Sequence, residues 1–283
     1  MRKNNTLKNT IIYGFDSAWT DNPRKPGAIC AVTYDADGKS RFYEPEMATF
    51  SKAEEFISEK EYRKKNDTRK PYQLSLIALD QSLVVKNATG MRPVEKIAGA
   101  AVGWAGGGVQ PSNKSRKKMF DENAGIWKFL SNQEAILDAN LAKKNLSGRY
   151  IIEVFPALAL LGLNQNFFRR NGSPRYNPAN QNFNIEDWQS VCNLIAKKSN
   201  DLELIQLSKW AEKAGKIAEP KKEDQDKLDA AICALIGLIW IACDESCSMM
   251  IGNMQTGYMI TPVIEKMRIR LEEASQRHGI IKI

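Results

Sequence analysis

The longest uninterrupted apolar run in the chain, AAICALIGLIWIAC at residues 230–243, constrains the fold more than any other segment. Its 14 residues are too few to cross a bilayer, which takes about 20, so we predict a buried core helix. With about 3.6 residues per turn, one face of that helix reads Asp226, Asp229, Cys233 and Gly237. The other face carries larger apolar side chains, so another element can approach the small-residue face closely.

Two aspartates, Asp226 and Asp229, stand at the head of this apolar run. Taken alone, they are explained by helix capping and by the helix dipole, which favour an acid at a helix start by about 0.5–1 kcal/mol. Two further acids follow apolar runs elsewhere, Asp16 after IIYGF and Asp80 after LSLIAL. An acid at a strand end is usually a turn residue, but the joint pattern is more specific. We therefore predict that the four carboxylates converge.

Several carboxylates that meet without basic partners repel one another strongly. Oxygen ligands of this kind suit hard divalent cations, and we predict Mg²⁺ or Mn²⁺ at Asp16, Asp80, Asp226 and Asp229. Two such ions about 3.5–4 Å apart stabilise the attacking and leaving oxygens of an in-line phosphoryl displacement. The sequence thus predicts a two-metal phosphodiesterase centre.

The order of the apolar segments predicts an α/β fold with a mixed sheet. Residues 11–16, 28–34 and 39–45 read as three consecutive antiparallel strands, the last two joined by the turn DADG. Buried strands at residues 74–80 and 150–156 alternate with helices, and residues 257–262 are expected to form a last edge strand. We expect a single domain over residues 1–283, with an irregular and helical insertion at about residues 160–222.

These segments resemble a known group of folds. A first strand with Asp16, an inner strand with Asp80 and a late D-x-x-D helix resemble the RNase H-like fold, especially its Holliday-junction-resolvase branch. More narrowly, the chain resembles the predicted nucleases called domain of unknown function 429 (DUF429). The matching segments, in chain order, are GFDSAW, ALDQSL, EVFPAL, DKLDAAICAL and GYMITP.

The resemblance implies a metal-dependent nuclease and adds Glu153 to the catalytic acids Asp16, Asp80, Asp226 and Asp229. Two positions depart from the family's pattern. Ser82 stands where the family commonly has proline, and Arg92 is followed three residues later by Glu95 rather than by aspartate. Neither departure touches the expected metal ligands.

Charge predicts an anionic partner. The chain has 41 Lys and Arg against 33 Asp and Glu, a net charge of +8, which favours nucleic acid. The segments GWAGGGVQPSNKSRKK and FFRRNGSPRY combine glycines or aromatics with cations, and we predict phosphate contacts from Lys114, Arg116, Lys117, Lys118, Arg169 and Arg170. A solvated loop, or aromatics that only anchor a loop to the core, explains the same residues. The first segment fails the nucleotide P-loop pattern.

The cysteine and histidine content limits the kinds of catalysis that are possible. The five cysteines include no CxxC pair and read as reduced structural thiols, and a single histidine, His278, argues against catalysis by a histidine base. The basic N-terminus lacks the apolar segment of a signal peptide, so we expect a soluble, cytoplasmic protein without a membrane partner.

Three functions remain open on these residues. The first is a metal-dependent nuclease, a hydrolase of phosphodiester bonds in DNA or RNA. The second is a catalytically inert nucleic-acid-binding or assembly protein on the same fold. The third is a phosphotransferase, because sugar kinases and related ATPases share this broad fold, although no convincing nucleotide-phosphate loop is present.

Overall fold

A computed structural model describes residues 7–61 and 72–280 of the chain. A second basic run of the sequence, YRKKNDTRK at residues 62–70, lies outside the described residues. The described part contains no helix long and apolar enough to cross a membrane. All five cysteines are unpaired, and four of them are buried, as expected of structural thiols.

The main sheet has five strands in the order β3-β2-β1-β4-β5. Strands β1 (Thr10–Asp16), β2 (Gly27–Tyr34) and β3 (Ser40–Ala48) pair antiparallel, while β4 (Leu74–Leu79) and β5 (Gly148–Glu153) extend the sheet in parallel from β1. Every residue of β1, β2 and β4 is buried, which is typical of strands covered on both faces. The predicted mixed α/β sheet is confirmed.

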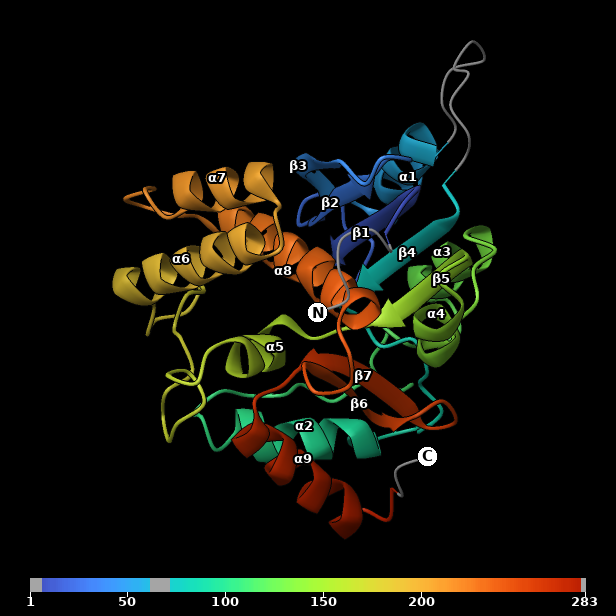
Figure 1. Cartoon of the computed structure of the whole chain (residues 1–283). Helices are drawn as coiled ribbons and strands as arrows, with labels where there is room; N and C mark the ends of the chain where they lie inside the picture. Colours follow the sequence, from blue (N-terminus) through green and yellow to red (C-terminus); the bar gives the residue numbers. More distant parts are fainter. Residues whose placement is uncertain (1–6, 62–71, 281–283) are drawn as a thin grey trace.

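Helix α8 (Lys222–Ala242) crosses one face of this sheet and is buried along most of its length (Figure 1). Its close approach to β1 depends on Gly14, where a Cβ atom would lie 2.0 Å from the carbonyl oxygen of Ala230. Gly237 allows the same close approach from the helix side, because a Cβ atom there would lie 3.1 Å from Ala78 Cβ and Ile12 Cγ2. The predicted contact through a face of small side chains is therefore confirmed.

Helix α8 starts about one turn before Asp226, the residue near which the sequence indicated its start. The helix begins at Lys222, just after Pro220, and the Asp224 carboxylate accepts a hydrogen bond from the Lys221 amide at 2.8 Å. Asp224 therefore satisfies an amide before the first turn. Asp226 and Asp229 lie in the second and third turns, where no free helical N–H groups remain, so capping does not explain them.

An aromatic cluster fixes the other face of the sheet. Helices α1 (Phe50–Glu61) and α3 (Gly125–Asn132) pack together there. Their Phe50 and Phe129 rings lie 5.9 and 5.6 Å from the ring of Phe15, with centroids 5.3 Å from each other. Phe15 directly precedes Asp16, so its contacts with Phe50 and Phe129 anchor the end of β1.

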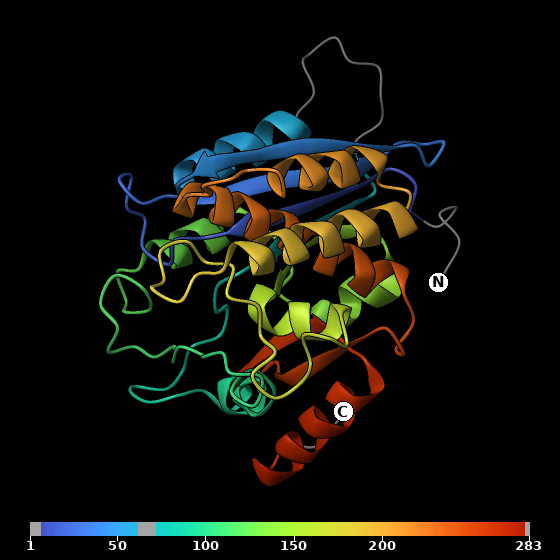
Figure 2. The ribbon, with the colours of Figure 1, turned by 90° about the vertical axis from the view of Figure 1, so that its left-hand side faces the viewer.

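A second, two-stranded sheet lies below α8 in Figure 1, and the predicted edge strand belongs to it. Strand β7 (Gly257–Pro262) forms over the predicted residues, but it pairs antiparallel with β6 (Ser248–Asn253) and not with the main sheet. Helices α2 (Pro93–Val102) and α9 (Glu265–Arg277) pack against this small sheet (Figure 2). A single bridge between Val154 and Ile260 joins the two sheets.

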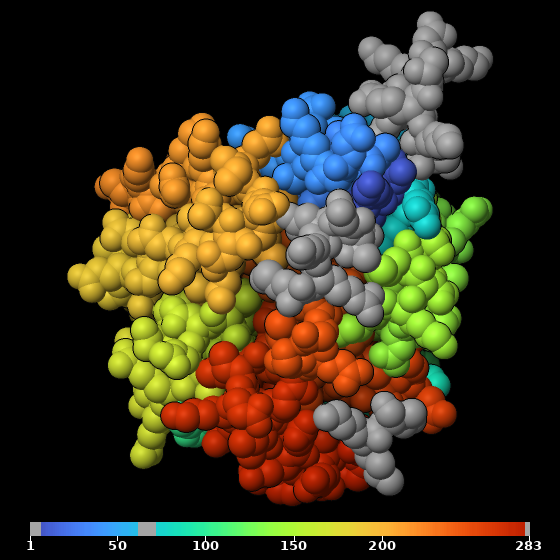
Figure 3. All heavy atoms as spheres, viewed as in Figure 1, coloured from blue at the N-terminus to red at the C-terminus, as the bar shows by residue number. Residues whose placement is uncertain are grey.

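Four further helices complete the described structure: α4 (Ala139–Asn145) beside β5, α5 (Pro156–Leu163) after β5, and the pair α6 (Ile185–Asp201) and α7 (Ile205–Ala214). An irregular segment of about twenty residues connects α5 to α6. In Figure 3 the residues from the end of α5 to the start of α8, yellow to orange, gather on one side of the molecule. The predicted single domain with an insertion at about residues 160–222 stays a prediction.

Candidate active site: a carboxylate pocket

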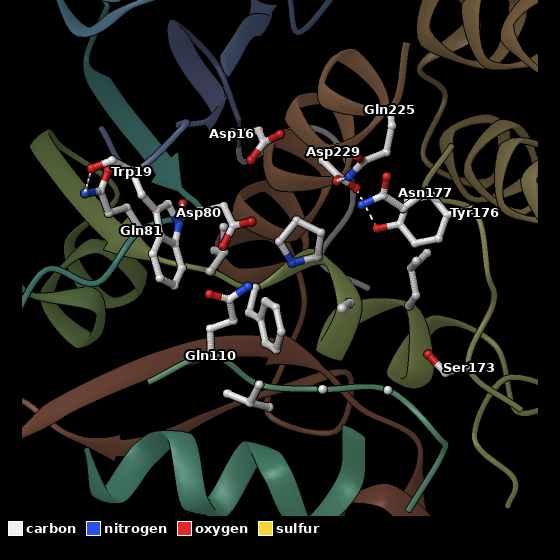
Figure 4. Close-up of a pocket in the computed structure, with 18 of the residues that line it drawn as sticks. Asp16, Trp19, Asp80, Gln81, Gln110, Ser173, Tyr176, Asn177, Gln225 and Asp229 are labelled. Atoms are coloured by element: carbon white, nitrogen blue, oxygen red, sulfur yellow. Dashed lines mark hydrogen bonds between the residues drawn. The ribbon is translucent and has the colours of Figure 1, made fainter. Parts of the chain in front are cut away.

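A pocket of about 620 Å³ opens between the main sheet, the N-terminal half of α8 and the small sheet. Residues after β1, β4 and β5 line it from above, as do α8 residues, and the glycine-rich loop 106–110 lines the opposite side (Figure 4). The carboxyl ends of parallel strands are the usual place for a ligand in an α/β sheet. The position of the pocket therefore makes it the candidate functional site.

Three of the four predicted metal ligands, Asp16, Asp80 and Asp229, line this one pocket (Figure 4), and so does Glu153. Asp16 ends β1, and Asp80 directly follows β4. These strands pair in parallel up to Phe15 and Leu79, and the Asp80 amide donates to the Phe15 carbonyl at 2.9 Å, so the two acids emerge side by side. The structure thus brings together residues 64 and more positions apart in the sequence.

Burial and mutual repulsion raise the pKa of all three acids. The pKa of Asp16 lies well above its ordinary value, first because of burial and then because of Asp229 and Asp80. Burial also raises the pKa of Asp80, with Asp229 adding to the effect. The pKa of Asp229 rises to about 7, mainly through burial. Perturbed carboxylates grouped in a cleft indicate a functional site rather than a surface cluster.

Asp229 is held by two neighbours that the sequence did not identify. The Tyr176 hydroxyl donates to Asp229 Oδ1 at 2.7 Å, and the Gln225 amide nitrogen donates to Asp229 Oδ2. Gln225 stands four residues before Asp229 on α8, a spacing that places both on one helix face. Tyr176 comes from the irregular segment before α6, and no local pattern connects it with Asp229.

The side chain of Gln225 leaves one acceptor without a partner. Its Oε1 atom is buried and has no hydrogen-bond partner in the structure, although Gln225 lines the pocket. A buried polar atom without a partner costs about 1–3 kcal/mol. A cation, or water bound to one, would satisfy this oxygen as well as the neighbouring carboxylates.

Asp226, the fourth predicted metal ligand, is placed differently. It does not belong to the lining of the pocket, and its carboxylate forms an ion pair with the ammonium group of Lys222, four residues earlier on α8. Lys222 itself lines the pocket and its charge lowers the pKa of Asp16 and Asp229. Asp226 therefore holds the ammonium group of Lys222 beside the other acids.

Glu153 has a structural partner of its own. Its carboxylate accepts hydrogen bonds from Arg92 Nη2 at 2.6 Å, Arg92 Nη1 at 3.1 Å and the Leu83 amide at 2.9 Å. Arg92 also bonds Glu95 Oε1 at 2.8 Å, and all three charged side chains are almost fully buried. Both oxygens of Glu153 thus accept hydrogen bonds. This acid stabilises the pocket wall, whereas a catalytic role beside the metals was predicted.

The predicted nucleic-acid contacts fall into two groups. Arg116 does not line the pocket itself, but its guanidinium lies 5.8 Å from the centre of the ring of Trp19, which does. Lys114, Lys117 and Lys118 are exposed on the same loop, and Arg169 and Arg170 are exposed beyond α5, but none of these five lines the pocket. Arg175, the third arginine of the segment FFRRNGSPRY, does line it.

The donor set at the pocket fits a hard divalent cation. Asp16, Asp80 and Asp229 offer carboxylate oxygens, Gln225 adds an amide oxygen, and the pocket offers neither histidine nor cysteine. Among the described residues, however, no three acidic, histidine or cysteine side chains form a preassembled metal cluster. The reason lies on α8, where Asp229 is turned to Tyr176 and Gln225 and Asp226 to Lys222. Coordination would require these side chains to rotate.

Comparisons of the chain with protein-family models, with curated proteins and with solved structures find no match.

Proposed function

We propose that this protein is a divalent-metal-dependent nuclease with an RNase H-like fold. The observation that carries the proposal is the convergence of Asp16, Asp80 and Asp229, from two strands and a helix, in one pocket. Three antiparallel strands followed by two parallel ones are compatible with that fold. The net charge of +8 favours a polyanionic substrate.

Each side chain has a proposed part in the reaction. Asp16 and Asp80, which have no basic residue bonded to their carboxylates among the described residues, would hold Mg²⁺ or Mn²⁺ between them. Asp229 would complete the ligand set after release from Gln225. Bound divalent cations supply Lewis-acid stabilisation of the charge that develops on the phosphodiester.

The protein's own groups then set the orientation of substrate and water. Lys222, half exposed at the pocket edge, would attract a phosphate oxygen. The Tyr176 hydroxyl would stabilise the ionised form of Asp229 through its hydrogen bond to Oδ1. The buried Arg92–Glu153 pair keeps the end of β5 in place beneath the carboxylates.

Cleavage of labelled DNA and RNA in Mg²⁺ or Mn²⁺ tests the proposal. Wild type is expected to produce metal-dependent fragments, and Asp16→Asn is expected to lose at least about a hundredfold in rate, since removal of one strong electrostatic contact to a transition state costs about that much. Asp201→Asn, at an exposed position on α6, is the matched control. Undiminished cleavage by Asp16→Asn would refute the assignment.

The absence of a preassembled metal cluster among the described side chains favours a second candidate, an inert nucleic-acid-binding or assembly protein. This candidate predicts salt-sensitive binding of polynucleotides without products. Calorimetric titration with Mg²⁺ separates the two. A nuclease should give heat that disappears in Asp229→Asn, whereas an inert protein should give no site-specific heat at all.

A further inference from the structure

Part of the pocket has a chemistry that the metal-dependent reaction does not use. Besides the carboxylates, the lining includes one indole ring and several side-chain amides, namely Trp19, Gln81, Gln110 and Asn177 (Figure 4), together with Asn180 and Asn182. A phosphate group and metal ions need neither. An aromatic face beside amide donors and acceptors is instead the combination that binds a nucleobase.

The indole ring of Trp19 is fixed next to Asp80. Its Nε1 donates to the Asp80 carbonyl at 3.2 Å, and Gln81 Nε2 donates to the Trp19 carbonyl at 3.4 Å. Gln81 is in turn bonded to Ser17, the residue that follows Asp16. The ring is therefore tied to the two segments that carry Asp16 and Asp80.

The backbone of Trp19 is strained, with φ at +60°. A bulky residue rarely adopts a positive φ, and such strain persists where the surrounding structure enforces it, often at ligand sites. The hydrogen bonds at both ends of Trp19 supply that enforcement. The chain thus holds a large half-buried ring in an unfavourable conformation at the rim of the carboxylate pocket.

A cation accompanies the ring. The guanidinium of Arg116 lies 5.8 Å from the ring centre and is positioned by the Pro111 carbonyl at 2.8 Å and by Gln110 Oε1 at 3.1 Å. Phe120 packs edge-on against Trp19 at 5.3 Å. A base stacked on Trp19 would therefore bring its backbone phosphates near a prepositioned arginine.

The size of the pocket limits what can enter. About 620 Å³ is within the range of small-ligand sites, which is room for one nucleotide but not for a continuous double helix. Nucleic-acid enzymes with pockets of this kind act on single strands or on an extruded nucleotide.

We infer that the pocket binds one unpaired nucleotide, with its base stacked on Trp19 and its phosphate directed to Asp16 and Asp80. This inference rests on the proposed nuclease function and adds its substrate class, single-stranded or unpaired DNA or RNA. Gln110 and Asn177 would bond the edges of the base, and Arg116 a neighbouring phosphate.

Fluorescence anisotropy tests the inference with a labelled 12-nucleotide single strand and the matching blunt duplex, with Ca²⁺ in place of Mg²⁺. Wild type should bind the single strand more tightly than the duplex. Trp19→Leu should weaken that binding by about 5- to 150-fold, the usual effect of removing one stacked aromatic, and Trp19→Phe by less. Trp210→Leu is the matched control, because Trp210 is also half-buried and packs edge-on against Phe42, on α7 and outside the pocket.

Thermal unfolding of each variant confirms that it folds, and Arg116→Ala provides a second route if Trp19→Leu does not. Equal binding of duplex and single strand, or single-strand binding by Trp19→Leu and Arg116→Ala within twofold of wild type, would overturn the inference. A cleavage assay run beside it keeps the two proposals apart. Trp19-dependent binding without cleavage rejects the nuclease alone, and cleavage of duplex that is indifferent to Trp19 rejects the unpaired nucleotide alone.

Discussion

Replacement of Asp229 by asparagine should stabilise the metal-free protein. Burial raises the pKa of Asp229 from 3.8 to about 7. At 1.36 kcal/mol per pH unit, its ionisation costs the fold about 4 kcal/mol at pH 8. The asparagine avoids this cost, and it keeps the hydrogen bond from Tyr176. Gln225 can turn its amide over, so that Oε1, which now lacks a partner, accepts from the new Nδ2 atom.

The effect should depend on pH in a defined direction. Because the pKa of Asp229 is raised in the folded state, the folded protein binds the proton more tightly than the unfolded chain does, and wild-type stability falls as pH rises from 3.8 to about 7. The advantage of Asp229→Asn should therefore approach about 4 kcal/mol at pH 8 and fall below about 1 kcal/mol at pH 4.

Urea unfolding in EDTA at pH 4, 6 and 8 measures this difference, with the free energy of unfolding extrapolated to water. Asp201→Asn, which removes an exposed carboxylate, should change stability by less than about 0.5 kcal/mol. Mg²⁺ at a hundred times its Kd should narrow the difference at pH 8 to about 1 kcal/mol, because it adds about 2.7 kcal/mol to the stability of wild type alone. An Asp229→Asn variant that is less stable than wild type at pH 8 in EDTA, or a difference that does not change with pH, would refute the reasoning.

Three further predictions follow from contacts described above. Arg92→Met leaves two buried carboxylates unpaired and should cost about 3–5 kcal/mol, seen as a lower Tm; a change below about 1 kcal/mol would contradict it. Gly14→Ala should abolish soluble expression, because its Cβ atom would lie 2.0 Å from a carbonyl oxygen of α8. Gly99→Ala, in the middle of α2, should raise stability by about 0.5–1 kcal/mol in thermal unfolding, because a Cβ atom there meets nothing within 4 Å. Tyr176→Phe removes a hydrogen bond that lowers the pKa of Asp229, so calorimetry should find Mg²⁺ bound about tenfold more weakly at pH 7 and less affected at pH 8.5; equal loss at both pH values would argue against it.

The local patterns of the sequence predicted most of the main sheet. Buried apolar runs and the DADG turn were enough for the antiparallel strands β1 to β3, and the period of α8 predicted that its small-residue face would meet the sheet. The convergence of Asp16, Asp80 and Asp229 could be predicted as well, because parallel strand ends and a helix face carry each acid to the same edge of the sheet.

What the sequence could not predict depends on contacts between distant segments. Glu153 looks like any strand-end acid until Arg92, 61 residues earlier, is seen to occupy both of its oxygens. Tyr176 reaches Asp229 from an irregular segment with no periodic signal. The small sheet was missed because β7 has the composition of an edge strand, and only its pairing with β6 reveals a separate sheet.

The position of Val154 has a mechanical consequence for the whole molecule. Its amide donates to Leu79 at the end of β4, and the same residue bridges to Ile260 of β7, so one residue of the chain belongs to both sheets. Local opening of the small sheet must break this link next to the carboxylates, and we expect backbone amides of β7 to exchange with deuterium no faster than those of β4. The link at Val154 also argues against a hinge between the two sheets beside the pocket.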